Sequence, residues 1–209
     1  MKRTFTLVEL LVVTVIIGII VGATVPAFSR LMTGNAVSYG LRMTTSQLNM
    51  ARTEACARRR YVAVVFPDKA SDDANAYLPD SGDNVGYKCS FRSCYVIRNG
   101  AKYEFDRWVP GTKWEYLPKG AYFEDVDNAI ELEKVKDEDG LFKDEHEYTV
   151  HAVIFSDTGR SAGKNTFKVV VREGIVTDNK TVTRNNNPDN KLTAKVNLYT
   201  GSVRTVQPE

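Results

Sequence analysis

The stretch Phe5-Thr6-Leu7-Val8-Glu9-Leu10-Leu11 opens the longest apolar run of this chain and decides the architecture that we expect. Residues 10–29 carry no charge, and Arg30 ends the run. Twenty helical residues that rise about 1.5 Å each would measure roughly 30 Å, the thickness of a bilayer's hydrocarbon layer. The basic stub Lys2-Arg3 favours a cytoplasmic start and an outward-facing remainder. The sequence therefore predicts a transmembrane helix over residues 5–30.

Glu9 argues against two common explanations of such a run. A cleavable secretory signal carries positive charge only ahead of its apolar core, although Ala23 and Ala27 offer small residues to a signal peptidase. A plain signal anchor is disfavoured as well, because a carboxylate at the edge of a membrane span is costly unless it has a partner. We therefore favour an explanation that gives Glu9 a partner.

Residues 4–11 resemble the cleavage and methylation motif of type IV prepilins and type II secretion pseudopilins, Phe-Thr-Leu-x-Glu-Leu ahead of an apolar run. The resemblance implies that a prepilin peptidase cuts between Thr4 and Phe5, removes residues 1–4 as a leader, and N-methylates Phe5. Glu9 then becomes the fifth residue of the mature chain. One difference is Thr4 itself, since the family has glycine before the cut.

The same resemblance assigns an assembly role to Glu9. Cleavage leaves a cationic amine on Phe5, and the Glu9 carboxylate of an incoming subunit is expected to reach that amine on a neighbour. In a layer of low dielectric constant such a pair is much stronger than in water. Pro26 matches a family position where the first helix bends or melts, and we expect a helix kink there.

The helical pattern continues past the apolar run, over residues 31–60. Small or apolar residues recur there at alternating spacings of four and three, which is typical of a helix with one buried face: Val37, Leu41, Thr44, Leu48, Ala51 and Ala55. We expect this stripe to pack on the sheet of the same domain. Arg58-Arg59-Arg60 ends the helix, where cations are favourable with the helix dipole. A nucleic-acid patch is disfavoured there, because no aromatic interleaving accompanies the cluster.

Beyond residue 60 the signals are those of strands. Tyr61–Phe66 is rich in β-branched and aromatic residues and stops at Pro67, and Asn99-Gly100 is the strongest hairpin signal. Further strands are expected at 95–98, 101–105, 150–155, 167–171, 192–199 and 202–206, with turns at Asp157-Thr158-Gly159 and Thr200-Gly201. One helix followed by strands predicts an α+β fold. We expect a long N-terminal helix, membrane-spanning in its first half and amphipathic in its second, packed on an antiparallel β-sheet head of residues 61–209, the pilin-like fold.

The later blocks narrow the resemblance. Residues 48–60, read as Leu-x-x-Ala-Arg-x-Glu-Ala followed by a basic cluster and a strand, are similar to H-type minor pseudopilins and FimT-type minor pilins. Residues 154–159 and 200–204 are similar to later blocks of the same family. Residues 110–147 have no counterpart there and are interpreted as an insertion. Its acidic part, 124–147, is predicted to be a solvated loop, since its spacing fits no EF-hand calcium loop.

The three cysteines leave one question open. Cys89 and Cys94 are separated by four residues, and both a local disulfide and two free thiols are compatible with the sequence. Cys56 lies in the helical pattern and is predicted to be a small packed apolar residue. No metal site is expected, because the two histidines lie far from these cysteines and no second cysteine pair exists.

Composition and motifs exclude several other functions. The formal net charge of +2 on 209 residues gives no field that would collect nucleic acid. The chain has no Walker loop, dinucleotide fingerprint or nucleophile elbow, so we expect no enzyme and no cofactor. Some FimT-type minor pilins bind DNA through a Gly-Arg-x-Arg element, whose equivalent here, residues 201–204, keeps only Arg204. DNA uptake is thus an alternative function, and a signal-anchored periplasmic enzyme is a weaker one.

We interpret the chain as a non-catalytic subunit, a minor pseudopilin or minor pilin, of a type II secretion pseudopilus or a type IV pilus. The resemblance implies other pilin or pseudopilin subunits, a prepilin peptidase, an inner-membrane assembly platform and membrane lipid as partners. It also implies a bacterial inner-membrane location with the head in the periplasm, followed by insertion into the filament. The sequence does not separate the secretion system from the pilus.

Overall fold

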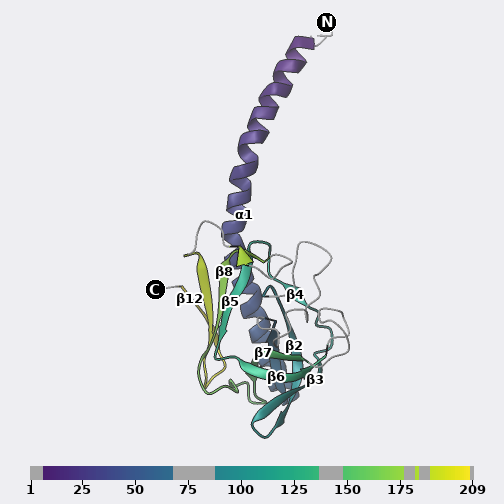
Figure 1. Cartoon of the computed structure of the whole chain (residues 1–209), viewed down its shortest axis with the longest axis vertical. Coiled ribbons are helices and arrows are strands. Elements are labelled where there is room, and N and C mark those ends of the chain that lie inside the picture. Colours follow the sequence, from purple (N-terminus) through teal and green to yellow (C-terminus); the bar gives the residue numbers. More distant parts are fainter. Residues whose placement is uncertain (1–6, 68–87, 137–147, 177–181, 184–188, 208–209) are drawn as a thin grey trace.

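The computed structural model describes residues 7–67, 88–136, 148–176, 182–183 and 189–207, without the side chains of 23–34 and 182–183. A single helix, α1 (Leu7–Arg58), begins the described chain. Its first half projects away from the remainder, and its second half lies against the strands (Figure 1). Within the described ranges, no helix meets the combination of length and apolar character needed to cross a membrane.

The strands that follow α1 form three sheets. In chain order they are β1 (Tyr61–Phe66), β2 (Ser90–Asn99), β3 (Lys102–Trp108), β4 (Glu115–Tyr116), β5 (Ala121–Asp127), β6 (Ile130–Val135), β7 (Tyr148–Phe155), β8 (Phe167–Glu173), β9 (Ile175–Val176), β10 (Val182–Thr183), β11 (Lys191–Val196) and β12 (Val203–Val206). A six-stranded sheet has the order β1-β7-β6-β3-β2-β4, a four-stranded sheet has the order β12-β11-β8-β5, and β9 pairs with β10.

The six-stranded sheet closes on itself. Strand β1 pairs with β7 on one side and with β2 on the other, so β1, β7, β6, β3 and β2 form a complete ring. Four of the five pairings in this ring are antiparallel, whereas β3 and β6 run parallel. The ring is a five-stranded barrel, with β4 paired to the first residues of β2. Because a closed barrel has no free edge, every strand in it is paired on both sides.

The barrel encloses its own core. Side chains that alternate with the outward-facing ones form a buried apolar cluster, which consists of Ala63, Val65, Cys94, Val96, Tyr103, Leu132, Val135, Val150, Ala152 and Ile154. In β1 the residues between them, Val62, Val64 and Phe66, belong to a second and larger cluster. Strand β1 is therefore buried on both faces, which explains why its sequence is a continuous apolar run.

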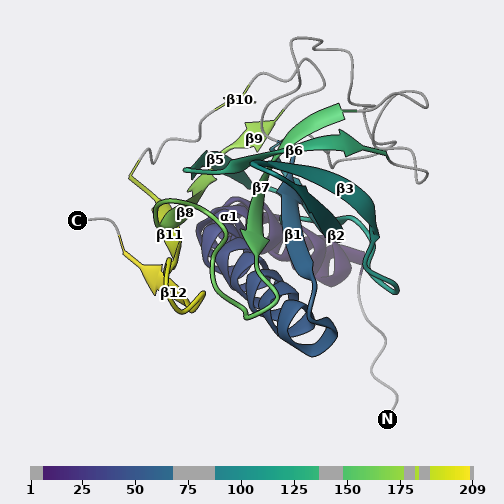
Figure 2. The same cartoon turned by 90° about the horizontal axis from the view of Figure 1, so that it is seen from below.

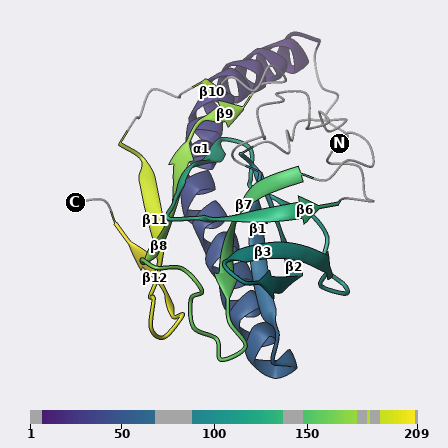
Figure 3. The same cartoon turned by 60° about the horizontal axis from the view of Figure 1, so that its bottom comes forward.

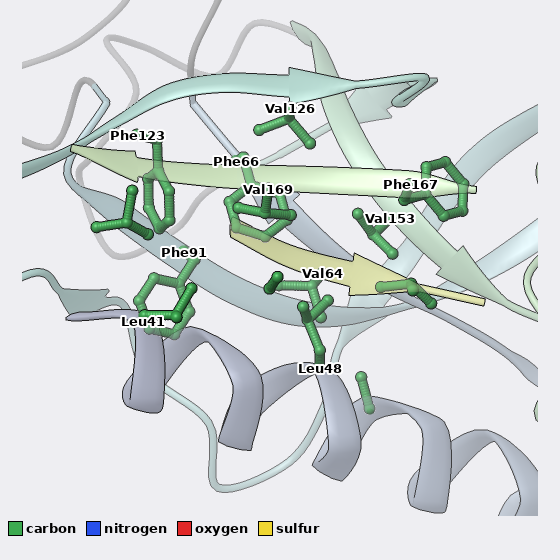
Figure 4. Close-up of a cluster of buried hydrophobic side chains, with 14 of the residues drawn as sticks. Leu41, Leu48, Val64, Phe66, Phe91, Phe123, Val126, Val153, Phe167 and Val169 are labelled. Carbon is green, nitrogen blue, oxygen red and sulfur yellow. The ribbon is translucent and has the colours of Figure 1, made fainter. Parts of the chain in front are cut away.

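The larger core lies where α1, the outside of the barrel and the four-stranded sheet meet. Figure 3 shows α1 running between β8, β11 and β12 on one side and β1, β2 and β7 on the other. Three phenylalanines from separate strands, Phe66, Phe91 and Phe123, pack edge to face or tilted with ring centroids 5.0–6.4 Å apart. From the helix, Leu41 points toward Phe91 and Leu48 points toward Val64 (Figure 4).

The predicted stripe of the helix is confirmed. All six of its members are buried, with at most 3% of their surface exposed: Val37, Leu41, Thr44, Leu48, Ala51 and Ala55. Gly40 lies on the same face, and a Cβ there would lie 3.0 Å from Cδ2 of Leu117. The helix end is capped by its own chain, because Arg59 adopts a φ of 52° and the Arg60 amide donates to the Ala55 carbonyl at 3.2 Å.

Two glycine turns fasten the sheets to the helix. The guanidinium Nε of Arg52 donates to the Gly159 carbonyl at 3.2 Å, in the turn after β7. Gly201, in the turn between β11 and β12, lies against that same carbonyl, and a Cβ on Gly201 would be 1.9 Å from the oxygen. Both turns were predicted from sequence, and their glycines have φ values of 75° and 64°. The two turns thus meet at one point on α1.

The predicted fold class is wrong in two respects. The helix was expected to span a membrane, and no described helix meets that requirement. The body was expected to be one antiparallel sheet packed on the helix, and it is instead a mostly β-strand body with a closed barrel, a parallel pair and a separate four-stranded sheet. Figure 2 shows the strands curving over α1 from both sides.

Much of the difference comes from residues 110–147, which were interpreted as an insertion with an acidic solvated loop. The predicted acidic loop, 124–147, is wrong for residues 124–127 and 130–135, which lie in β5 and β6, while 137–147 lie outside the described residues. That 110–147 is an insertion stays a prediction. The strands were not predicted because acidic side chains interrupt the apolar pattern of this region. Glu133 pairs with Lys102 at 2.6 Å, and Lys134 pairs with Glu104 at 2.8 Å, so β6 forms crossed ion pairs with β3. Leu132 and Val135 point into the barrel.

Replacing Leu132 by alanine tests whether β6 is a core strand. Leu132 is fully buried in the barrel, so we expect Leu132→Ala to lower the free energy of unfolding by about 2–5 kcal/mol. The exposed neighbour Glu131 supplies the matched control, and Glu131→Ala should change the value by no more than about 0.5 kcal/mol. Chemical denaturation of the three proteins measures both. Equal stability of the two variants would show that this segment is not part of the core.

Gly201→Ala tests the contact between the two turns. Gly100→Ala is the matched control, because Gly100 has the same φ of 64° as Gly201. A methyl group added at Gly100 would meet no heavy atom within 4 Å, so this variant measures the cost of the backbone strain alone. We expect Gly100→Ala to cost about 1–2 kcal/mol from the left-handed backbone. Gly201→Ala should cost at least about 2 kcal/mol more, because its methyl meets a backbone oxygen. Thermal unfolding measures the difference, and equal losses would contradict the contact.

Candidate assembly site

The first turns of α1, residues 7–22, expose apolar side chains on every side. Twelve large apolar residues in this segment are between 45% and 81% exposed: Leu7, Val8, Leu10, Leu11, Val12, Val13, Val15, Ile16, Ile17, Ile19, Ile20 and Val21. A helix that is apolar all round is normally buried in its functional surroundings, because water is a poor solvent for such a surface. We call residues 7–22 the apolar rod.

Glu9 is the one charged residue in the sequence of the apolar rod. It is exposed and lies in the first described turn of α1, where a carboxylate is favourable with the positive end of the helix dipole. The rod therefore combines a large apolar surface with a single acid near its start. Such a combination favours a neighbour that supplies both apolar contact and a cation.

The remaining predicted residues of the assembly motif are only partly tested. Thr4 and Phe5 lie outside the described residues, so cleavage between them and N-methylation of Phe5 stay predictions. Pro26 lies within α1, which continues through it as one helix, but its side chain is not described. The helix kink at Pro26 also stays a prediction.

The structure contradicts a disulfide between Cys89 and Cys94. Both thiols are free and buried. Cys94 faces the barrel interior opposite Ala63, whereas Cys89 lies just before β2 in a small cluster with Tyr122 and Val176. The four strand steps from residue 90 to residue 94 alone span about 13 Å, and a disulfide needs Cα atoms roughly 4.4–6.8 Å apart. Oxidation would therefore require β2 to leave the barrel.

Burial also sets the chemistry of the thiols. It raises the pKa of Cys89 to about 12, and it raises the pKa of Cys94 as well, with a smaller opposing effect of nearby Arg92. Both side chains are thus neutral thiols at physiological pH. The prediction that Cys56 is a small packed apolar residue is wrong, because this cysteine is exposed on α1.

The arginine cluster at the end of α1 has local partners within the head. Arg58 pairs with Glu54 at 3.2 Å, and the Tyr95 hydroxyl donates to the same carboxylate at 2.5 Å. This hydrogen bond, followed by burial, raises the pKa of Tyr95. The guanidinium groups of Arg60 and Arg107 each lie 5.5 Å from the centre of the Tyr95 ring. The cluster joins the end of α1 to β2 and β3.

Arg204, the residue of the DNA alternative, is exposed on the edge strand β12. It lies opposite Lys195 of β11 in the strand register, so two cations are neighbours there. Ser202, which stands where the DNA-binding element has its other arginine, shares a hydrogen bond of 2.9 Å with Thr200. DNA binding through this hairpin stays a prediction.

Ser156 and His151 are residue types that hydrolases use, and both lie in or directly after β7. Ser156 shares a hydrogen bond of 3.0 Å with Thr158 in the turn after β7. His151 lies within β7, opposite Phe66 and Glu131 in the register. Among the described residues, no group of three or more His, Cys, Asp or Glu side chains is placed to hold a metal ion.

Comparisons with known proteins add little to this description. No family model matches the chain, and no curated protein matches it. A search of solved structures returns the crystal structure of the type IV minor pilin FimU from Pseudomonas aeruginosa strain PAO1. The two chains share 10% sequence identity with a TM-score of 0.44, over 84% of this chain and 90% of that one. A likeness of this size does not establish what the chain does.

Thiol labelling tests the placement of the cysteines. We expect a maleimide reagent to modify only Cys56 in the folded protein at pH 7, because Cys89 and Cys94 are buried neutral thiols. All three should react after unfolding in denaturant without a reducing agent. Mass spectrometry counts the labels in each state. A single label on the unfolded, unreduced protein would show that Cys89 and Cys94 form a disulfide.

Proposed function

We propose that this protein is a non-catalytic structural subunit of a filament of the type IV pilin kind. The observation that carries the proposal is the apolar rod, which projects from a well-packed head and exposes apolar side chains on every side (Figure 1). Side-by-side packing of such rods removes their surface from water at about 25 cal/mol per Å² of apolar area. The head, which has its own two cores, needs no contribution from the rod.

Glu9 gives this packing a register. Rods with only apolar side chains would slide along one another, since apolar contact is non-directional. A carboxylate in a layer of low dielectric constant requires a cationic partner, and the cost of leaving it without one is several kcal/mol. In the proposed filament that partner is the N-terminal amine of Phe5 on a neighbouring subunit, the role that the prepilin motif implies.

The wider partners follow from the same motif. A prepilin peptidase would act at Thr4–Phe5, and an assembly platform at the bacterial inner membrane would add the subunit to the filament, with the head on the periplasmic side. Support for these steps comes from the resemblance of residues 4–11 alone.

Replacing Glu9 tests the proposal directly. We expect Glu9→Ala and Glu9→Val to abolish incorporation into filaments in the native host, because neither side chain can pair with the amine. The melting temperature of the purified protein should not change, since Glu9 lies on the rod, outside both clusters that form the cores of the head. Immunoblots of sheared filaments and thermal unfolding measure the two quantities.

Glu131→Ala is the matched control for these variants, because it removes an exposed acid from the head and leaves the rod unchanged. It should enter filaments at the level of the unaltered protein. Normal incorporation of either Glu9 variant would contradict the proposed pairing. An intact Met1 on the mature protein from the native host, detected by N-terminal mass spectrometry, would contradict the cleavage step.

A further inference from the structure

One end of the barrel is open and lined by residues that no function above uses. The C-terminal ends of β2 and β7 lie at this end of the barrel, together with the N-terminal ends of β1, β3 and β6. A cavity of about 480 Å³ lies there, within the range of roughly 300–1,000 Å³ that ligand sites occupy, and barrel mouths are common places for such sites. We call this cavity the barrel mouth; its lining is Arg98, Ala101, Tyr103, Asn128, Ala129, Ile130, Ala162, Gly163, Lys164 and Asn165.

The lining has an apolar floor. Tyr103, which is only 8% exposed, and its register partner Leu132 on β6 belong to the core of the barrel. Ile130 and Ala162 pack against the same core from the rim side. Burial raises the pKa of Tyr103, so its hydroxyl is a neutral donor at physiological pH. The floor therefore suits an aliphatic chain that carries a hydrogen-bond acceptor.

Two cations stand at the rim, and no carboxylate balances them within the lining. Arg98 comes from the end of β2 and Lys164 from the loop between β7 and β8, and both are exposed. Tyr61, through a side-chain hydrogen bond, and Tyr103 raise the pKa of Arg98. The ten lining residues include no Asp or Glu. The barrel mouth is thus a basic site within a protein whose formal net charge is only +2.

The polar groups of the rim bear on which class of ligand the cavity could bind. The Asn128 side chain donates to the Thr166 carbonyl at 2.9 Å and accepts from the Asn165 amide at 3.4 Å. Asn128 thus uses one side-chain donor and one acceptor lone pair within the rim, and Asn165 uses one donor, so both side chains are partly committed to holding the rim together. The Gly163 amide donates to Ser161 at 3.3 Å, so it is not available to a phosphate group.

The Arg98 Nε donates to the Gly100 carbonyl at 3.1 Å, and a side-chain hydrogen bond joins Arg98 to Tyr61, so part of this guanidinium is used within the protein. The other guanidinium donors and the Lys164 ammonium match carboxylates and phosphates alike.

We propose that the barrel mouth binds an acidic peptide segment of another protein, with its carboxylates on Arg98 and Lys164 and its aliphatic part on the floor of Tyr103 and Ile130. The two cations come from different elements and share one cavity with an apolar floor, a combination that matches a segment with both acidic and apolar residues. A single small anion would leave most of the cavity unfilled. The proposal does not depend on the filament function.

A fluorescent tetrapeptide, Glu-Ala-Leu-Glu with blocked ends, tests the site on the full-length protein by fluorescence anisotropy. We expect saturable binding that weakens with salt, and about tenfold or greater loss of affinity in Arg98→Gln/Lys164→Gln, because both carboxylates lose a charged partner. The isosteric peptide Gln-Ala-Leu-Gln should lose affinity by a similar factor. Absence of saturable binding up to millimolar peptide would overturn the proposal.

Two further variants keep the result interpretable. Lys113→Gln/Arg204→Gln removes two exposed cations elsewhere and should bind the peptide normally, so an equal loss in this control would show non-specific charge attraction and overturn the proposal. Ala101→Trp keeps all charges but places a bulky group at the rim, on an exposed hairpin residue, and should block binding. Displacement of the peptide by equal concentrations of inorganic phosphate or glucuronate would assign the mouth to another anion and refute the peptide.

Discussion

Burial of β1 on both faces is the constraint on which the rest of the head depends. Val62, Val64 and Phe66 face α1 and the four-stranded sheet, while Ala63 and Val65 face the barrel interior. One strand of six residues thus belongs to both cores. It also lies directly after α1, so the helix and the barrel are joined by two residues of chain. A polar residue at any of these five positions would have to be buried without water, which costs about 1–3 kcal/mol or more in a protein interior.

The elements that were correctly predicted from the sequence are those with strong local signals. A period of 3.6 in α1 and a continuous apolar run in β1 are strong signals, and both elements were found where they were expected. The Asn99-Gly100 hairpin and the turns at Gly159 and Gly201 were found as well, because each requires a residue that tolerates positive φ. Such local sequence signals predict helices, strands and turns without knowledge of the tertiary structure.

The closure of the barrel could not be predicted from the sequence, because the strand that closes it lacks the usual strand signals. Strand β6 reads Ile-Glu-Leu-Glu-Lys-Val, so half of its residues are charged, and it pairs with β3 in parallel, without a hairpin signal. Its charges are matched by Lys102 and Glu104 of β3, which are remote in sequence. The distance between Cys89 and Cys94 was similarly hidden, because it depends on whether the intervening residues are extended. Of the candidate site, the composition of the apolar rod was predictable, whereas the barrel mouth exists only after closure.

The rod and the head follow opposite rules of solvation, and this contrast is the strongest clue to function. In the head, large apolar side chains are buried in two cores, and exposed ones such as Ile97 and Tyr199 are scattered. In the rod, every large apolar side chain is exposed, and nothing in the described chain covers it. The head is stabilised by its own buried apolar clusters, so the exposure of the rod does not reflect incomplete packing of the fold. In the proposed filament the surface of the rod packs against another rod of the same composition, and a single acid such as Glu9 would then select one register among many of nearly equal apolar contact.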